Sequence, residues 1–172
     1  MYNQQIKTTS TIRKKVYKFF ILLYQWLKTN KPQKKIKIEI KLMYYFNNKS
    51  SFLRKKFERR LYYKYHCEIS RMSKIDESVE FTHPISVIIG SRAIVEEKCL
   101  IYQNVTIGAN FNKNNNEMPY IRKNTKIGAG AKLIGGIEIG ENCIIGANAV
   151  VTKSVPKNSI VYGANKIKPI SK

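Results

Sequence analysis

The chain has 172 residues, which suits one domain with an appendage, and 43% hydrophobic residues are enough to build a core. Its 32 Lys and Arg against 11 Asp and Glu give a formal net charge of +21. Three cysteines without a signal-peptide pattern exclude a disulfide framework and favour a reducing, cytoplasmic compartment. The apolar run 16–27 is about half the roughly 20 residues that span a bilayer, which excludes a transmembrane helix there.

Residues 1–66 predict a basic, mainly helical segment, with 18 basic and two acidic residues. Within it, 13–28 (RKKVYKFFILLYQWLK) places large side chains at helical spacing, and 51–65 predicts a second, basic helix. The stretch 35–42 alternates with period two and leaves strand or helix open. The spaced apolar residues of the first helix are Val16, Phe19, Phe20, Leu23, Trp26 and Leu27.

Two roles remain open for this basic segment. It is either a small helical cap on the following domain, or an interfacial attachment of residues 13–28 to the inner face of a membrane, where aromatics and cations meet anionic lipid. Nucleic-acid binding is disfavoured because no reading module is visible.

Residues 67–172 carry a period of six, the strongest pattern in the sequence. Three such units close a triangular coil of 18 residues, so Ile89 should stack beneath Ile107 and Ile127 beneath Ile145. A coil cannot bury its core alone, and stability comes from stacking its neighbours. The aliphatic or aromatic residues that recur every sixth position are Ile69, Ile75, Phe81, Ile89, Val95, Ile101, Ile107, Ile121, Ile127, Leu133, Ile139, Ile145 and Val151.

Two further positions of the repeat have their own residue preferences. The fourth residue after each of these is small or β-branched in most units, so Cys99 and Cys143, which fall there, are interpreted as core residues. The third residue after each sixth-position residue is Asn or Gly in six units, as expected for corners with positive φ. Those six corner residues are Asn104, Asn124, Gly130, Gly136, Asn142 and Asn148.

The repeat is interrupted twice. Phe81 and Ile89 are eight residues apart, which inserts two residues around His83, and Ile107 and Ile121 are fourteen apart. The surplus of the second interruption falls in 109–120 (ANFNKNNNEMPY), an expected loop. Interruptions of a solenoid tend to lie on its functional face, so both are candidate site elements.

Three segments resemble a known family: FTHPISVIIGSRAIVEEKCLIYQNVTIG (81–108), IGAGAKLIGG (127–136) and IGANAVVTKSVP (145–156). They are similar to the serine acetyltransferase branch of the hexapeptide-repeat acyltransferases, and equally to its polysaccharide O-acetyltransferases, such as the colanic acid acetyltransferases. This resemblance implies a left-handed parallel β-helix, a homotrimer and acetyl-CoA as donor.

The resemblance also implies site residues. His83 matches the catalytic histidine and Glu68 the carboxylate that orients it, with Glu in place of the usual Asp. The imidazole would take the acceptor hydroxyl proton, and a backbone N–H near Gly108 or Ala109 would meet the oxyanion. The matching positions along the expected pantetheine groove are Gly108, Ala109, Ala129, Gly130, Ala147 and Asn148. Lys153 is placed to meet the CoA phosphates.

One departure from the family bears on the acceptor. Where serine acetyltransferases carry Arg and His for the amino-acid substrate, this chain has Glu117 and Met118. A serine carboxylate would lose its cation and face a like charge, which favours a saccharide hydroxyl, in a polysaccharide or a lipid-linked precursor. The alternatives are serine O-acetylation for cysteine biosynthesis and a non-catalytic scaffold. A metal site is not expected, because a metal-dependent carbonic anhydrase of this fold needs three histidines and the chain has two.

Overall fold

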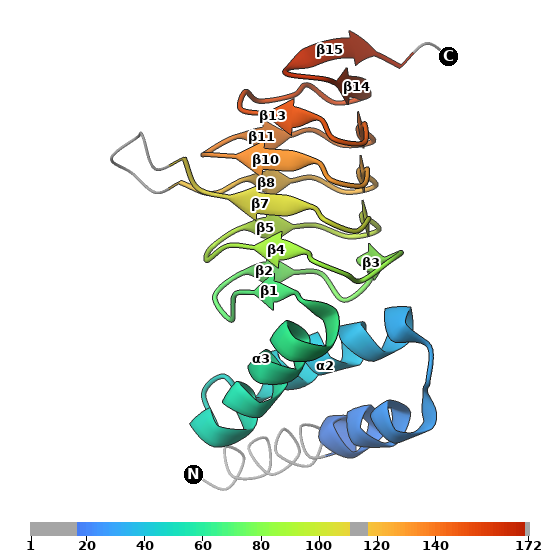
Figure 1. Cartoon of the computed structure of the whole chain (residues 1–172), viewed down its shortest axis with the longest axis vertical. Coiled ribbons are helices and arrows are strands. Elements are labelled where there is room, and N and C mark those ends of the chain that lie inside the picture. Colours follow the sequence, from blue (N-terminus) through green and yellow to red (C-terminus); the bar gives the residue numbers. More distant parts are fainter. Residues whose placement is uncertain (1–16, 111–116, 171–172) are drawn as a thin grey trace, which may run out of the picture.

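The structure is a computed structural model that describes residues 17–110 and 117–170. Helices form one end, and a stack of short strands rises from them to the C-terminal end (Figure 1). The helices are a segment at 17–28, α2 (Pro32–Phe46) and α3 (Ser51–Tyr65). The second predicted helix is therefore confirmed, with Ser50 accepting the backbone N–H of Leu53 as its N-cap at 3.3 Å.

Helix α2 resolves the period-two stretch at 35–42 as a helix. Steps of two residues turn about 200° around a helix, so the alternating aliphatics fall on two opposite sides. Both sides are buried, Ile36 and Ile40 on one and Ile38 and Leu42 on the other. The alternation therefore reflects a helix that is covered on two faces.

Helix 17–28 confirms the predicted helical spacing over its described part, whereas residues 13–16 lie outside the described residues. Its buried face differs from the prediction. The helical spacing groups Phe20 and Leu27 with Phe19, yet they are 60% and 64% exposed, while Leu22 is buried. The reason is tertiary: Phe19 stacks on Tyr45 of α2, with ring centroids 5.5 Å apart, and this fixes which side faces inward.

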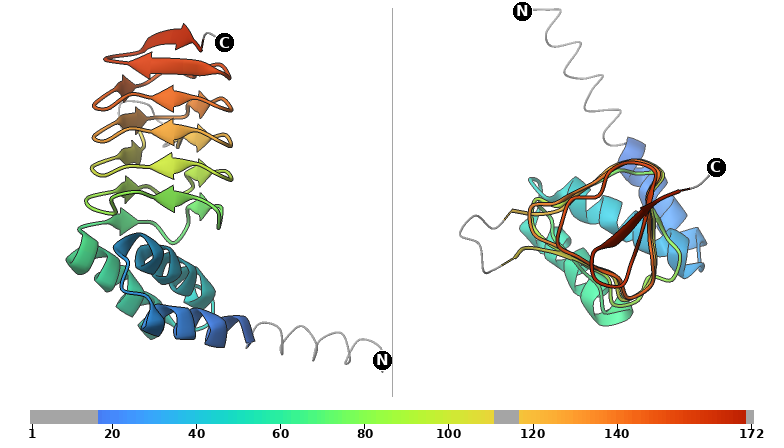
Figure 2. Two further views of the ribbon diagram at one scale, coloured as in Figure 1. Left: turned by 90° about the vertical axis from the view of Figure 1, so that its right-hand side faces the viewer. Right: turned by 90° about the horizontal axis from the view of Figure 1, so that it is seen from above.

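The strands form a left-handed parallel β-helix with three walls. Wall A has the order β1-β4-β7-β10-β13, wall B β11-β8-β5-β2 and wall C β15-β14-β12-β9-β6-β3. Seen along the stack, the coils superimpose as a triangle (Figure 2). The strands are β1 Glu68–Ile69, β2 Lys74–Ile75, β3 Glu80–Phe81, β4 Ile88–Ile89, β5 Ile94–Val95, β6 Leu100–Ile101, β7 Thr106–Gly108, β8 Tyr120–Ile121, β9 Lys126–Ile127, β10 Lys132–Ile134, β11 Glu138–Ile139, β12 Ile144–Ile145, β13 Val150–Val151, β14 Ser159–Tyr162 and β15 Lys166–Pro169.

The interior is the one that the repeat predicts. Ile89 pairs with Ile107 and Ile127 with Ile145 in parallel register. The thirteen sixth-position residues are buried except Ile75, which is partly exposed, and Cys99 and Cys143 are buried beside them. Thr125 occupies the same slot as these cysteines, and its buried hydroxyl donates to the Gly140 carbonyl at 3.0 Å.

Positive φ marks the corners, with one shift from the prediction. Five of the six predicted residues have φ between 55° and 72°, but at the sixth corner Gly135 (φ 94°) takes this conformation instead of Gly136. There β10 is one residue longer than most strands, and the corner is built around the Gly135 N–H, which donates to Gly108. Arg92 and Lys98 also have positive φ, which their residue types did not indicate.

Both ends of the coil stack are covered. Helices α2 and α3 pack beneath the first coil, against β3 and β1, and the antiparallel pair β14–β15 lies over the last. In the part of the chain that the structure describes, every helix is too short or too polar to cross a bilayer.

Candidate functional site

His83 lies at the corner between wall C and wall A, where the repeat is interrupted. The loop is held by its backbone: Ile85 N–H donates to the His83 carbonyl at 2.8 Å, and Ser86 N–H donates to Tyr65 of α3 at 3.0 Å. Ser86 has φ 54°, which turns the chain into β4. The imidazole is left exposed on the outside of the corner.

The successive residues at this C–A corner form a column. Tyr102 occupies the corner of the next coil, with its ring centroid 6.3 Å from that of His83. Above it, Gly130 N–H donates to the Gln103 carbonyl at 2.9 Å, and Asn148 N–H donates to Ala129 at 2.8 Å. Four predicted donor-binding residues, Ala129, Gly130, Ala147 and Asn148, therefore share the corner of His83. None of the four carries a side chain larger than Asn.

Close packing at this corner depends on Gly128. A β-carbon there would lie 2.7 Å from the backbone nitrogen of Ala147 and 2.8 Å from the carbonyl oxygen of Ile145. Both neighbours are backbone atoms of the coil above, which cannot rotate away. The small residue thus lets the two coils meet at normal strand spacing beside the candidate groove.

Glu68 is close to His83 along the backbone but is not bonded to it. Glu68 N–H donates to Val87 at 3.0 Å, so the two segments are neighbours in wall A. Within the described residues no hydrogen bond joins the two side chains. The Glu68 side chain instead lines an open cleft of about 610 Å³ between α3 and wall A, together with Arg59, Tyr62 and Arg71.

The other predicted residues lie at the opposite edge of wall A, the A–B corner. Gly108 and Ala109 begin the expected loop there, Glu117 and Met118 end it, and Lys153 follows β13. Met118 covers Gly90, where a β-carbon would lie 2.6 Å from Cε of Met118. The Glu117 side chain packs against Gly136, where an added β-carbon would lie 2.1 Å from Oε2 of Glu117. Residues 111–116 of the expected loop 109–120 lie outside the described residues.

A single chain therefore holds the predicted site as two separated halves. Wall A lies between them, and about six residues per wall at roughly 3.3 Å each span up to about 20 Å, so the two corners lie well over about 10 Å apart. His83 and Ala109 therefore flank wall A from opposite sides within one chain.

Sequence reasoning missed two residues of the C–A corner and its flank. Tyr102 is partly exposed beside the imidazole, and its signal is an aromatic ring at an outward position of the repeat. Lys132 lies on wall A, where its Nζ donates to the Asn104 carbonyl at 2.7 Å and to Thr106 Oγ1 at 3.1 Å. It is a cation on the His83 side of the wall, whereas Lys153 is on the other.

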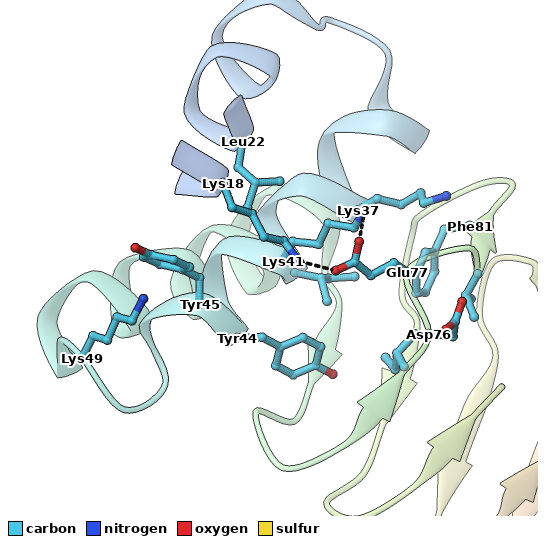
Figure 3. A pocket seen from close by; sticks show the side chains of 13 residues that line it. Lys18, Leu22, Lys37, Lys41, Tyr44, Tyr45, Lys49, Asp76, Glu77 and Phe81 are labelled. Carbon is cyan, nitrogen blue, oxygen red and sulfur yellow. Dashed lines mark hydrogen bonds and ion pairs between the residues drawn. The ribbon is translucent and has the colours of Figure 1, made fainter. Parts of the chain in front are cut away.

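One pocket lies away from these corners. It has a volume of about 380 Å³ and lies between helix 17–28, α2 and the first coil (Figure 3). Glu77 crosses it, with Oε1 2.8 Å from Lys18 Nζ and Oε2 3.2 Å from Lys41 Nζ (Figure 3). Those ion pairs fasten the helices to the coils, so we assign the pocket a structural role.

Neither thiol chemistry nor a metal cluster is apparent in the described residues. All three cysteines are buried, and burial raises the pKa of each thiol, to about 11 for Cys99. No three His, Cys, Asp or Glu side chains of residues 17–110 and 117–170 gather closely enough to hold a metal ion.

Comparison with known proteins agrees with this architecture. Residues 118–153 match the family described as bacterial transferase hexapeptide (six repeats). The serine acetyltransferase of Synechococcus elongatus is 41% identical over 96 residues, which are 56% of this chain and 39% of that protein. A putative serine acetyltransferase of Schizosaccharomyces pombe is 36% identical over 100 residues, 58% and 37% of the two chains. The chain thus spans well under half of the length of these relatives.

Solved structures give the same result over more of the chain. A serine acetyltransferase in complex with CoA superimposes with a TM-score of 0.68 at 26% identity, over 78% of this chain and 55% of that one. Serine acetyltransferase isoform 3 of Entamoeba histolytica, in complex with cysteine, has a TM-score of 0.70 at 25% identity and covers 96% of this chain and 63% of its own. The hexapeptide β-helix and its helical end are therefore shared with these enzymes.

Proposed function

We propose that this protein is an acetyl-CoA-dependent O-acetyltransferase in which His83 is the general base. One observation carries the proposal: an exposed imidazole at the two-residue interruption of the coils, beneath a column of small corner residues. A histidine titrates near neutral pH, so it can accept the proton of an alcohol, which is a poor nucleophile without such help. The relatives and solved neighbours that are serine acetyltransferases, one of them with CoA, support the same chemistry.

The reaction requires one proton and one acyl group to move. His83 takes the hydroxyl proton while the acceptor oxygen attacks the thioester carbonyl. The tetrahedral oxyanion accepts hydrogen bonds from backbone N–H groups near Gly108 or Ala109, an effect typically worth about 10²–10³ in rate. Collapse breaks the carbon–sulfur bond, and the imidazolium returns its proton to the leaving CoA thiolate. Glu68 would orient the imidazole once ligand or a neighbouring chain brings the two side chains together.

The separation of the two half-sites supports a homotrimer. A cyclic assembly brings the C–A corner of one copy against the A–B corner of the next, so that His83 and Ala109 face one groove. In that groove the small residues Ala129, Gly130, Ala147 and Asn148 allow the pantetheine to approach the backbone. Lys153 of one copy and Lys132 of its neighbour are then cations available for the CoA phosphates.

Two acceptors are supported by different observations. The named relatives support serine, and they do so better than they support a saccharide. The residues of this chain support a saccharide hydroxyl, because Glu117 is exposed and acidic and Met118 is occupied in covering Gly90. Neither side chain offers the cation that an amino-acid carboxylate needs.

The test is CoA release from acetyl-CoA, measured with the purified chain and either serine or a panel of saccharides. His83→Ala should lower kcat/KM by about 10²–10⁴ with an unchanged far-UV circular dichroism spectrum. Retained turnover would remove His83 from this role. The ratio of kcat/KM for serine and for the best saccharide decides between the two acceptors.

A further inference from the structure

Helix 17–28 has an exposed apolar face. Tyr17, Phe20, Tyr24 and Leu27 are 60–70% exposed, and at 100° per residue they fall within one arc of about 80°. Lys18 and Leu22 lie on the other side and line the pocket above (Figure 3). Phe20 follows Lys18 by two residues, and Tyr24 follows Leu22 by two. Two residues correspond to 200° of rotation around the helix, so Phe20 and Tyr24 point away from the coils. The Glu77–Lys18 ion pair holds this orientation.

Helix α3 presents a second exposed face of aromatic and basic residues. Phe52 and Tyr63 are 76% and 74% exposed, and Lys56 and Arg59 lie between them within an arc of about 60°. The two helices contact each other on their inner sides, where the Arg60 guanidinium of α3 lies 4.9 Å from the Trp26 ring centroid. Figure 1 shows both helices at the end of the molecule opposite the C-terminus.

The charge of this end is strongly positive. Residues 17–66 contain 14 Lys and Arg and only two acidic residues. Both acids are paired internally: Glu39 is fully buried against Arg60, and Glu58 pairs with Arg54 at 2.6 Å. No acidic side chain of residues 17–66 is therefore left unpaired on either face, and Glu68 lies at the edge of the α3 face, in the cleft that Arg59 also lines.

We propose that this end docks onto the surface of an anionic lipid bilayer, with the outer face of helix 17–28 in the head-group region and the cations of α3 on lipid phosphates. Aromatic rings are favoured at that depth, and each cation near the surface contributes about fivefold in partitioning. No helix in the described part of the chain can cross a bilayer, so the contact is interfacial. A second copy of the chain could cover the exposed apolar face of helix 17–28, but two such strongly positive ends would repel each other.

The experiment is co-sedimentation of the full chain with vesicles of phosphatidylglycerol or of phosphatidylcholine. Binding to phosphatidylglycerol, weakened by salt, is expected, with at most weak binding to phosphatidylcholine. Phe20→Ser with Tyr24→Ser should reduce binding at least tenfold. Its matched control, Ile144→Ser with Tyr162→Ser, removes two exposed apolar side chains of β12 and β14, away from this end, and should bind as the parent does.

Two double variants with the same change in net charge distinguish a local effect of the α3 surface from an effect of the overall charge of the protein. Lys55→Glu with Lys56→Glu should weaken binding more than tenfold, whereas Lys157→Glu with Lys166→Glu, the same change at the far end, should have little effect. Equal losses in both pairs, or no phosphatidylglycerol binding at low salt, would overturn the proposal. So would sedimentation velocity showing that Phe20→Ser with Tyr24→Ser halves the size of the lipid-free assembly, since the face would then join copies of the chain. Acetyl transfer to a soluble acceptor is measured on the same variants, so a defect in chemistry is distinguished from a defect in docking.

Discussion

The indole N–H of Trp26 donates to Oε1 of Glu39 at 2.9 Å, and the Glu39 side chain is completely buried. The same oxygen accepts from Nε and Nη2 of Arg60 at 3.1 and 3.0 Å. One carboxylate of α2 therefore joins helix 17–28 to α3. Burial raises the pKa of the nearby Tyr65 to about 12, with the charge of Glu39 as a second cause, so that phenol stays protonated in this cluster.

Glu39→Ala should destabilise the protein by about 2–4 kcal/mol, because it leaves a guanidinium and an indole N–H without their acceptor in a partly buried site. Urea unfolding followed by the fluorescence of Trp26, the single tryptophan, measures this. Glu58→Ala breaks a partly exposed pair within α3 and should cost less than about 1 kcal/mol. Equal losses for the two variants would contradict the joining role.

Gly128→Ala should destabilise the coils by about 2–3 kcal/mol, because the new methyl group meets backbone atoms of the next coil. Gly108→Ala is the control, since its β-carbon would lie 3.8 Å from its nearest neighbours, in ordinary contact. Thermal unfolding of both variants checks the difference. A Gly128→Ala protein as stable as Gly108→Ala would mean that the coils can separate at this corner.

Mixing two inactive variants should restore activity if the site lies between copies. His83→Ala removes the base, and Ala109→Trp fills the other half-site. In trimers reassembled from equal amounts of both, about a quarter of the grooves combine an intact His83 with an intact Ala109. We expect roughly that fraction of parental CoA release from the mixture and almost none from either variant alone. No recovery in confirmed mixed trimers would place the site within one chain.

Glu117→Arg should increase kcat/KM for serine by about tenfold or more, because it replaces a repulsive charge with a carboxylate-binding fork. Glu117→Gln serves as the control that removes the charge without adding a cation, and it should give a smaller gain. The measurement is serine-dependent CoA release beside release with the preferred saccharide. An unchanged serine rate in the Arg variant would show that residue 117 does not face the acceptor.

Acid should release helix 17–28 from the coils. The hydrogen bond from Lys18 is the largest cause that lowers the pKa of Glu77, followed, after an opposing effect of burial, by Lys41. A folded-state pKa below the unfolded value means that the contribution to stability is present above about pH 4.5 and is lost as pH falls through the folded value. Trp26 fluorescence between pH 6 and 3 should report the change.

Two variants separate this effect from general acid unfolding. Glu77→Gln should remove the acid-dependent step in Trp26 fluorescence and start from the released state. Glu141→Gln, in an exposed pair with Lys123 at 3.7 Å in the coils, should leave the step unchanged. A step that persists in Glu77→Gln would assign the transition to another carboxylate.

The sequence by itself determined the coils. Each wall needs one large apolar side chain every six residues, and this requirement is local and repeated. Counting along the sequence therefore predicts the strand register, the core residues and most corners of the β-helix, and Ile127 does lie beneath Ile145. One corner differs from the prediction, because the adjacent residues Gly135 and Gly136 can both adopt positive φ. In the folded protein Gly135 adopts it, and its N–H donates to the Gly108 carbonyl.

Tertiary structure decided everything that depends on two elements meeting. Spacing could not tell which side of helix 17–28 is buried, because nearly all of its circumference is apolar, and contact with α2 made the choice. Counting six residues per wall places His83 and Ala109 at opposite edges of wall A, but it could not show what packs against either edge. Periodicity fixes a residue's height and wall in the coil, whereas proximity across walls or between chains depends on how whole elements pack.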